Sequence, residues 1–174
     1  TLVVGDMPFM SYQRSVEEAV GNAGRFLKEA GADAIKLEGG KRVIPQVRAI
    51  LDAGIVVCGH IGLTPQSSGQ LGGHKAQGRT VDAAKVLVEE AIALQQAGIH
   101  FLLLEAVPPE VGQFITELLP IPVLSIGAGM HCDGQLIIVS DVIGQFQAFT
   151  PRFVKKYANV AEVVTTAISR YAAD

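Results

Sequence analysis

Charged and polar side chains follow short apolar runs at several points in this sequence of 174 residues. Apolar runs bounded by turn-forming residues are typical of buried β-strands. The polar residues at the ends of these runs are Asp6, Lys36 with Glu38, His60 and Glu105. Carboxylates, a lysine and a histidine grouped together could transfer protons, bind an anion or bind a hard metal ion. The group therefore predicts a chemical site, provided that the fold brings the strand ends together.

Glu105 is the candidate general base of this group. It follows Phe-Leu-Leu-Leu and precedes Ala-Val-Pro-Pro, so apolar residues flank it on both sides. Partial removal from water makes a carboxylate a better proton acceptor. The position also suits a structural carboxylate that caps the helix expected near Pro109 or pairs with a lysine, and the residues alone leave both interpretations open.

Lys36 and Glu38 lie two positions apart in Ala-Ile-Lys-Leu-Glu-Gly-Gly. Side chains alternate between the two faces of a strand, so both point to one face while Ile35 and Leu37 point to the other. A lysine that is buried on such a face needs an anionic partner. The partner is either the carboxylate of a substrate or Glu38 itself, in a structural ion pair.

Asp6 and Glu38 together predict a site for a hard divalent cation, for which Mg²⁺ is the best candidate, beside an anionic substrate. Oxygen ligands disfavour zinc, and the separation of Cys58 from Cys132 suggests two reduced thiols and not a metal site or a disulfide. Asp6 could instead be a turn carboxylate that accepts backbone hydrogen bonds. His60 could bind substrate, hold a neighbouring carboxylate or be a structural histidine.

Apolar periodicity predicts alternating strands and helices along the chain. We expect six strands, at residues 2–5, 34–37, 55–58, 100–104, 122–126 and 136–139. Helices are expected from the capping residue Ser15 to Gly31, over 41–53, over 81–97, and from an N-cap at Thr150 with Pro151 in the first turn. Residues 59–79 lack apolar periodicity, and a loop of this length is typical of a lid over a site.

Two parallel α/β architectures fit this order, a doubly wound open sheet and a (β/α)₈ barrel. In a barrel the strand ends meet at one mouth, where all the polar residues would converge, whereas an open sheet uses mainly one switch point. The barrel is therefore the preferred prediction. We expect residues 1–174 to form a single domain that supplies about six βα units, with roughly two units missing from the N-terminal part of the barrel.

Composition excludes several classes of function. The net charge is −3, Trp is absent and only 6% of residues are aromatic, which argues against nucleic-acid binding. No apolar run is long enough to cross a membrane and no leader segment opens the chain, so we expect a cytoplasmic protein.

Several short segments carry a family signature when they are taken in order. They are Asp-Met-Pro-Phe-Met-Ser-Tyr at 6–12, Ile-Lys-Leu-Glu-Gly-Gly at 35–40, Gly-His-Ile-Gly-Leu-Thr-Pro-Gln at 59–66, Gly-Gly-His-Lys-Ala-Gln-Gly-Arg at 72–79, Leu-Leu-Glu-Ala-Val-Pro at 103–108 and Ile-Gly-Ala-Gly at 126–129. In this order and spacing the chain resembles the ketopantoate hydroxymethyltransferase family over essentially its whole length. Each motif alone is a weak signal, whereas the ordered set is specific.

The resemblance implies a (β/α)₈ barrel that assembles as a homo-oligomer, usually a decamer. It implies transfer of a hydroxymethyl group from 5,10-methylenetetrahydrofolate to 3-methyl-2-oxobutanoate, which gives ketopantoate for pantothenate synthesis. By the same resemblance, Asp6 would ligate Mg²⁺ and contact the substrate, and Glu38 would belong to the coordination sphere of the metal. Lys36 would bind the substrate, and Glu105 would take the proton from C3. His60 is a possible contact of these residues, and the resemblance assigns it no role of its own.

One part of the family pattern is absent from the sequence. Family members carry an Asp-Ser pair earlier in the chain, where the aspartate is a second metal ligand and both residues hold the substrate. We therefore expect isolated residues 1–174 to bind metal poorly and to be inactive. The alternatives are a Mg²⁺-dependent carbon–carbon lyase or phosphonomutase of the related α-keto-acid barrels, and a non-catalytic barrel subunit. Such lyases and mutases typically use a catalytic cysteine or a gating loop, and neither Cys58 nor Cys132 lies in such a motif.

Overall fold

A parallel sheet of six strands is the framework of the protein. The strands are β1 (Val4–Asp6), β2 (Ala34–Glu38), β3 (Val56–Gly62), β4 (Phe101–Glu105), β5 (Val123–Ile126) and β6 (Gly134–Gln135). Each strand pairs in parallel with the next one along the chain, without any reversal of order. A doubly wound sheet contains such a reversal. The strand order therefore supports the barrel, and the six strands form a curled part of one.

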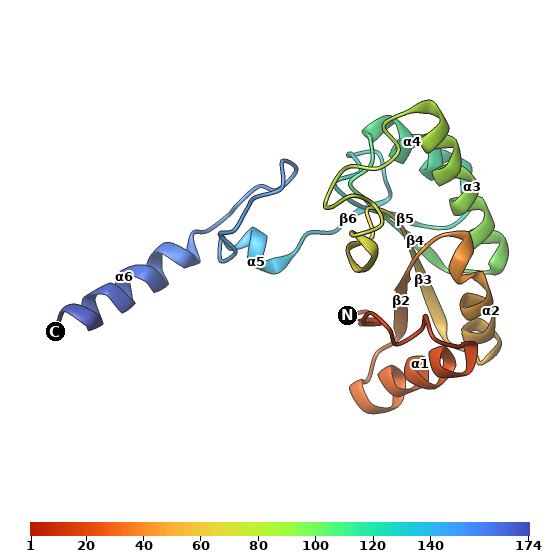
Figure 1. The fold of residues 1–174 in the computed structure, drawn as a ribbon, viewed down its shortest axis with the longest axis horizontal. Coiled ribbons are helices and arrows are strands. Elements are labelled where there is room, and N and C mark those ends of the chain that lie inside the picture. The colour runs from red at the N-terminus through yellow and green to blue at the C-terminus, as the bar shows by residue number, and fades with distance from the viewer. The chain divides into compact units, whose positions relative to one another are not determined.

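The helices that connect these strands lie on the same face of the sheet, as the ribbon in Figure 1 shows. They are α1 (Val16–Ala30), α2 (Ile44–Asp52), α3 (Val81–Ala97) and α4 (Pro109–Leu118). Helices α1 and α3 have the ends that the sequence predicted. Ser15 caps α1 by accepting a hydrogen bond from the backbone N–H of Glu18, and Gly31 ends the helix with a φ of 66°. Thr80 caps α3 in the same way, and Gly98 ends it.

The hydrophobic core lies between this face of the sheet and the helices. Ile35 and Leu37 of β2 are fully buried in it, together with Leu102 and Leu104 of β4. The alternate residues of the same strands point to the opposite face, which is the inner face of the curled sheet. The predicted alternation around Lys36 is thus confirmed, and it places Lys36 and Glu38 on the face opposite Ile35 and Leu37.

The computed structural model describes residues 1–174 as two compact units, Thr1–Gln135 and Leu136–Asp174. The second unit contains helices α5 (Val139–Val142) and α6 (Val160–Ala173). None of the helices in the structure combines the length and apolar character needed to span a membrane. The single domain predicted for residues 1–174 stays a prediction.

Two predictions near the C-terminus are wrong. The sixth strand is Gly134–Gln135 and not 136–139, because the backbone and side chain of Asp133 both bond to Val123 and bring the earlier residues beside β5. No helix starts at Thr150. The backbone N–H groups of Tyr157 and Val160 donate instead to carbonyl groups at the end of α5, so α6 begins only at Val160.

Candidate active site

The carboxyl ends of strands β1 to β4 bring the predicted site residues together. In the register of the sheet, Asp6 lies beside Lys36, and Glu38 lies beside His60. Glu105 lies beside Gly62, at the end of the next pair of strands. All the residues that the sequence singled out therefore occupy neighbouring positions on one edge of the sheet.

Lys36 is the centre of the polar contacts. Its Nζ lies 2.9 Å from Oδ1 of Asp6, 3.6 Å from Oε1 of Glu38 and 3.3 Å from Nδ1 of His60. An ammonium group has three N–H donors; Asp6 and His60 lie within hydrogen-bonding distance of it, and Glu38 lies just beyond. The Lys36 side chain is only 14% exposed, and its charge is therefore held inside the protein by surrounding acceptors.

His60 connects this group to Glu105. Its side chain is almost fully buried, with Nδ1 at 3.7 Å from Oε1 of Glu38 and Nε2 at 3.3 Å from Oε2 of Glu105. The second distance is within hydrogen-bonding reach, yet Nε2 forms no hydrogen bond because the two groups are poorly aligned. Nε2 of His60 is thus a buried nitrogen that lies close to the candidate base but forms no hydrogen bond with it.

The backbone around Glu105 is strained and held in place. Ala106 has a φ of 48°, which is uncommon for a residue other than glycine. The N–H of Ala106 donates to the carbonyl of Ile126, and its carbonyl accepts from the N–H of Gln77, both at 2.9 Å. Gly62 has a φ of 93°, and a Cβ there would lie 2.3 Å from the carbonyl oxygen of Glu105. Strain of this kind is concentrated at functional sites.

Tyr12 and Gln66 hold Glu38, although the sequence predicted no role for either residue. The backbone N–H of Gln66 donates to Oε2 of Glu38 at 3.0 Å, and the Tyr12 hydroxyl donates to Oε1 of Gln66 at 2.7 Å. The backbone N–H of Glu38 donates to the Tyr12 oxygen at 3.1 Å. Each residue ends one of the family segments, which was the available signal for both.

The segment predicted as a loop over 59–79 is partly a strand. Residues 59–62 belong to β3 and pair with β4, so this part of the prediction is wrong. After β3 the chain forms a short turn of helix, η2 (Pro65–Ser67). Arg42 donates to Ser67 and Gln70, while Gln66 contacts Glu38. Since Gln77 bonds to Ala106 as well, both ends of the segment 65–79 are tied to the site.

The carboxylates of Asp6 and Glu38 fit a hard cation in their chemistry. Oε1 of Glu38 faces Lys36 and His60 at 3.6 and 3.7 Å, distances that are too long for hydrogen bonds. That oxygen can therefore bind a ligand, and the Asp6 side chain is 60% exposed. No three His, Cys, Asp or Glu side chains form a ready-made metal site. Two carboxylates suit Mg²⁺, which commonly keeps water molecules and takes substrate oxygens.

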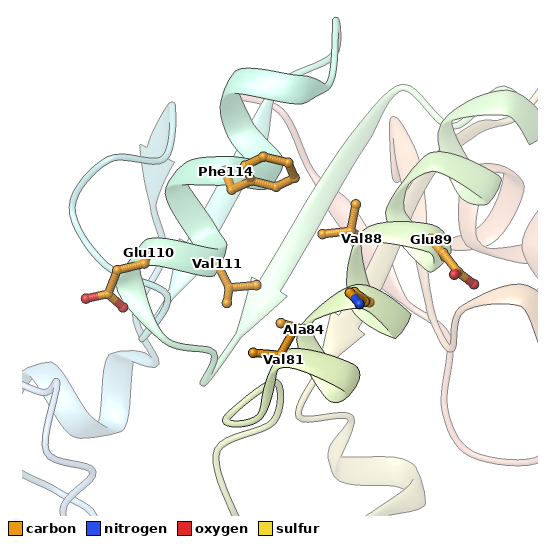
Figure 2. Close-up of a pocket in the computed structure, with 8 residues that line it drawn as sticks. Val81, Ala84, Val88, Glu89, Glu110, Val111 and Phe114 are labelled. Carbon is orange, nitrogen blue, oxygen red and sulfur yellow. The ribbon is translucent and has the colours of Figure 1, made fainter.

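An apolar groove of about 480 Å³ lies apart from this polar group, between α3 and α4. Figure 2 shows Val88 and Phe114 facing one another across it, with Glu89 and Glu110 at its rim. None of the strand-end residues lines the groove. We place the chemistry at the strand ends because a reaction of a small anion needs converging charged groups, which an apolar groove lacks.

Replacing Tyr12 with Phe tests the hydrogen bonds that hold Glu38. Burial raises the pKa of Tyr12 from 10.0 to about 12. The stability that the protonated Tyr12 hydroxyl gives to the fold is therefore fully present below pH 10.0 and is lost as the pH rises through about 12. The variant should be about 1–2 kcal/mol less stable at neutral pH, because Gln66 and Glu38 each lose a partner. It should also lose less stability than the wild type in alkaline solution. Urea unfolding at neutral and alkaline pH measures both effects.

The exposed Tyr171 provides the matched control, because its side chain is 82% exposed. Tyr171→Phe should leave both the stability at neutral pH and its alkaline decline unchanged. If Tyr12→Phe behaves like this control, the hydrogen bonds around Glu38 contribute nothing to the fold.

Solved structures show the fold that this chain shares with known enzymes of TIM-barrel fold. Orotidine 5′-monophosphate decarboxylase from Methanocaldococcus jannaschii matches with a TM-score of 0.57 and 15% identity, over 84% of this chain and 67% of that one. A putative phosphonomutase from Burkholderia cenocepacia J2315 matches with a TM-score of 0.55 and 14% identity, over 99% of this chain and 69% of that one. Both are TIM-barrel enzymes. At these identities the likeness concerns the fold alone.

Sequence relatives are much more similar. The chain is 66% identical over 174 residues to the 3-methyl-2-oxobutanoate hydroxymethyltransferase of Alkaliphilus metalliredigens (strain QYMF), covering 100% of this chain and 61% of that protein. It is 56% identical over 170 residues to the enzyme of the same name from Syntrophobacter fumaroxidans (strain DSM 10017 / MPOB), covering 98% of this chain and 60% of that protein. The chain thus spans about three fifths of the length of these curated relatives. A family model described as ketopantoate hydroxymethyltransferase matches residues 1–174, and the chain therefore belongs to the ketopantoate hydroxymethyltransferase family.

Proposed function

We propose that this protein transfers a hydroxymethyl group from 5,10-methylenetetrahydrofolate to 3-methyl-2-oxobutanoate, which gives ketopantoate. The observation that carries the proposal is the linked group of charged residues at the strand ends, in a chain whose relatives are named for this activity. In the overall reaction the C3–H bond of the keto acid breaks and a C–C bond to the one-carbon unit forms. Water supplies the hydroxyl group, and tetrahydrofolate leaves.

Glu105 is the proposed base. The keto group beside C3 acidifies the C3 proton, because the negative charge left behind spreads onto the keto oxygen as an enolate. The Glu105 side chain is 17% exposed, so its carboxylate is accessible from the inner face while apolar neighbours limit its hydration. A positioned base of this kind typically accelerates proton removal by about 10²–10⁴-fold.

Lys36 and Asp6 are the proposed substrate-binding residues. Lys36 carries a positive charge inside the protein, which suits the carboxylate of the keto acid. Its partner Asp6 is 60% exposed, and this is the contact that a substrate carboxylate would most easily replace. Asp6 can then turn its oxygens towards a cation while Lys36 pairs with the substrate.

Asp6 and Glu38 are the residues that would hold Mg²⁺, and Glu38 would do so through Oε1. When bound, the ion would stabilise the negative charge that develops on the keto oxygen. The segment 65–79 would keep water away from the reacting groups, because its ends are tied to Glu38 and Ala106. We also propose a homo-oligomer, on the resemblance to the family.

The direct test is ketopantoate formation by the complete protein from both substrates in the presence of Mg²⁺, followed by mass spectrometry. We expect product only when the folate and the keto acid are both supplied. Cleavage of a keto acid without folate would support a carbon–carbon lyase instead. A folded protein that turns over neither would support a non-catalytic barrel subunit.

A further inference from the structure

The position of the proton on His60 follows from its neighbours. The ammonium group of Lys36 can only donate hydrogen bonds, and it lies 3.3 Å from Nδ1 of His60. Nδ1 must therefore offer a lone pair. A proton on Nδ1 would place two donors face to face inside the protein. Neutral His60 consequently carries its proton on Nε2.

The Nε2–H group of His60 is a buried donor that lacks a partner. His60 is 1% exposed, and Nε2 forms no hydrogen bond in the structure. An unsatisfied donor at such a position is costly. Oε2 of Glu105 lies 3.3 Å away, so a small rotation of the Glu105 side chain would complete the bond. Hydrogen bonds at catalytic sites are often poorly aligned without substrate and tighten when substrate binds.

We propose that His60 positions the base Glu105 by donating Nε2–H to Oε2, which leaves Oε1 to take the C3 proton of the substrate. The proposal rests on the proposed function, in which Glu105 is the base. The proton moves from C3 to Oε1 of Glu105, and His60 keeps its own proton throughout. Lys36 has a second role here, because its contact with Nδ1 fixes the tautomer of His60.

The difference in burial between the two side chains assigns them different roles. Glu105 is 17% exposed and reaches the inner face, whereas His60 is 1% exposed and lies behind it. A substrate that enters from solvent therefore meets Glu105 first. His60 acts through Glu105 and is a positioning residue.

Two amide variants of His60 separate its two contacts in the complete protein. In His60→Gln the longer side chain places its amide N–H near the position of Nε2 and keeps a donor for Glu105. In His60→Asn the shorter side chain places its amide oxygen near the position of Nδ1 and keeps the acceptor for Lys36. Without the one-carbon donor, the exchange of the C3 proton of 3-methyl-2-oxobutanoate in D₂O is followed by NMR. We expect His60→Asn to slow it by about 10- to 100-fold, and His60→Gln to retain most of the wild-type rate.

Two further measurements do not depend on turnover. In protein labelled with ¹⁵N-histidine, the signals lost in His60→Gln identify His60, and they should show a protonated Nε2 and an unprotonated Nδ1. The analogue 3,3-dimethyl-2-oxobutanoate has no C3 proton and therefore cannot react. Its dissociation constant should be the same for wild type and His60→Asn, because His60 contacts Glu105 and not the substrate.

Each outcome decides one claim. A protonated Nδ1, weaker binding of the analogue by His60→Asn, or equal exchange rates for the two variants would overturn the role of His60 while leaving the proposed function intact. If the wild type itself shows no exchange, the proposed function fails, and the role of His60 fails with it. Thermal unfolding of both variants shows whether a loss of exchange reflects a loss of fold.

Discussion

Replacing Glu105 with Gln is expected to lower the rate of ketopantoate formation by about 10²–10⁴-fold, because the amide cannot accept the C3 proton. The amide has the shape of the carboxylate, and its oxygen can still accept a hydrogen bond from His60, which lies 3.3 Å from Oε2. The fold and the binding of 3-methyl-2-oxobutanoate should therefore be retained. Steady-state kinetics should show a lower kcat at a nearly constant KM, and exchange of the C3 proton should fall in parallel.

The control is the same substitution on the neighbouring helix. Glu110 lies in the first turn of α4 and is exposed, so Glu110→Gln should leave kcat and KM unchanged. Full activity of Glu105→Gln would make Glu105 a structural carboxylate, which is the interpretation that the sequence left open. A loss of activity accompanied by a lower thermal midpoint would also argue for a structural role.

Elements whose ends depend on local chemistry could be predicted from the sequence. Helix α1 follows from the spacing of Ser15 and Glu18 and from Gly31, and these residues make the capping contacts that the pattern requires. Helix α3 spans the predicted residues 81–97, between the cap Thr80 and Gly98. The parallel order also followed, because alternating strands and helices leave few other arrangements.

Elements that depend on distant contacts could not be predicted in this way. Residues 136–139 are apolar and resemble a strand, yet the strand forms two residues earlier, where Asp133 bonds to Val123 of the neighbouring strand. Thr150 and Pro151 are good helix-starting residues, but hydrogen bonds from Tyr157 and Val160 to the end of α5 hold the chain in another path. In both cases a contact outside the local window decided the structure.

The candidate site shows the same division. Strand alternation placed Lys36 and Glu38 on one face, and the strand ends placed Asp6 beside Lys36 and Glu105 at the same end of the sheet. The bridging position of His60 depends on the register of three strands, which the sequence does not encode locally. Tyr12 and Gln66 were missed because their side chains meet across 54 residues of sequence.

Lys36→Met is expected to reduce the free energy of unfolding by about 3–5 kcal/mol, because it removes the cation beside the buried carboxylate of Glu38. The Glu38 side chain is 4% exposed, and its Oε1 lies 3.6 Å from Nζ. Asp6 adds little to the loss, since its side chain is 60% exposed and water can replace the lysine there. Methionine keeps the length of the lysine stem and lacks only the ammonium group, so the change removes the charge and its hydrogen bonds. Urea unfolding in the presence of a chelator gives the full loss.

Mg²⁺ should reduce that loss if Asp6 and Glu38 hold a cation, because the ion replaces the missing positive charge and binds only the folded state. The difference between Lys36→Met and the wild type should therefore be smaller at saturating Mg²⁺ than in the chelator. Lys85→Met, on the exposed side of α3, is the matched control and should change stability by less than about 0.5 kcal/mol in either solution. If Mg²⁺ stabilises neither the wild type nor Lys36→Met, these carboxylates are not metal ligands. Because this readout is the stability of the fold, it tests the metal site without relying on the chemistry of Glu105.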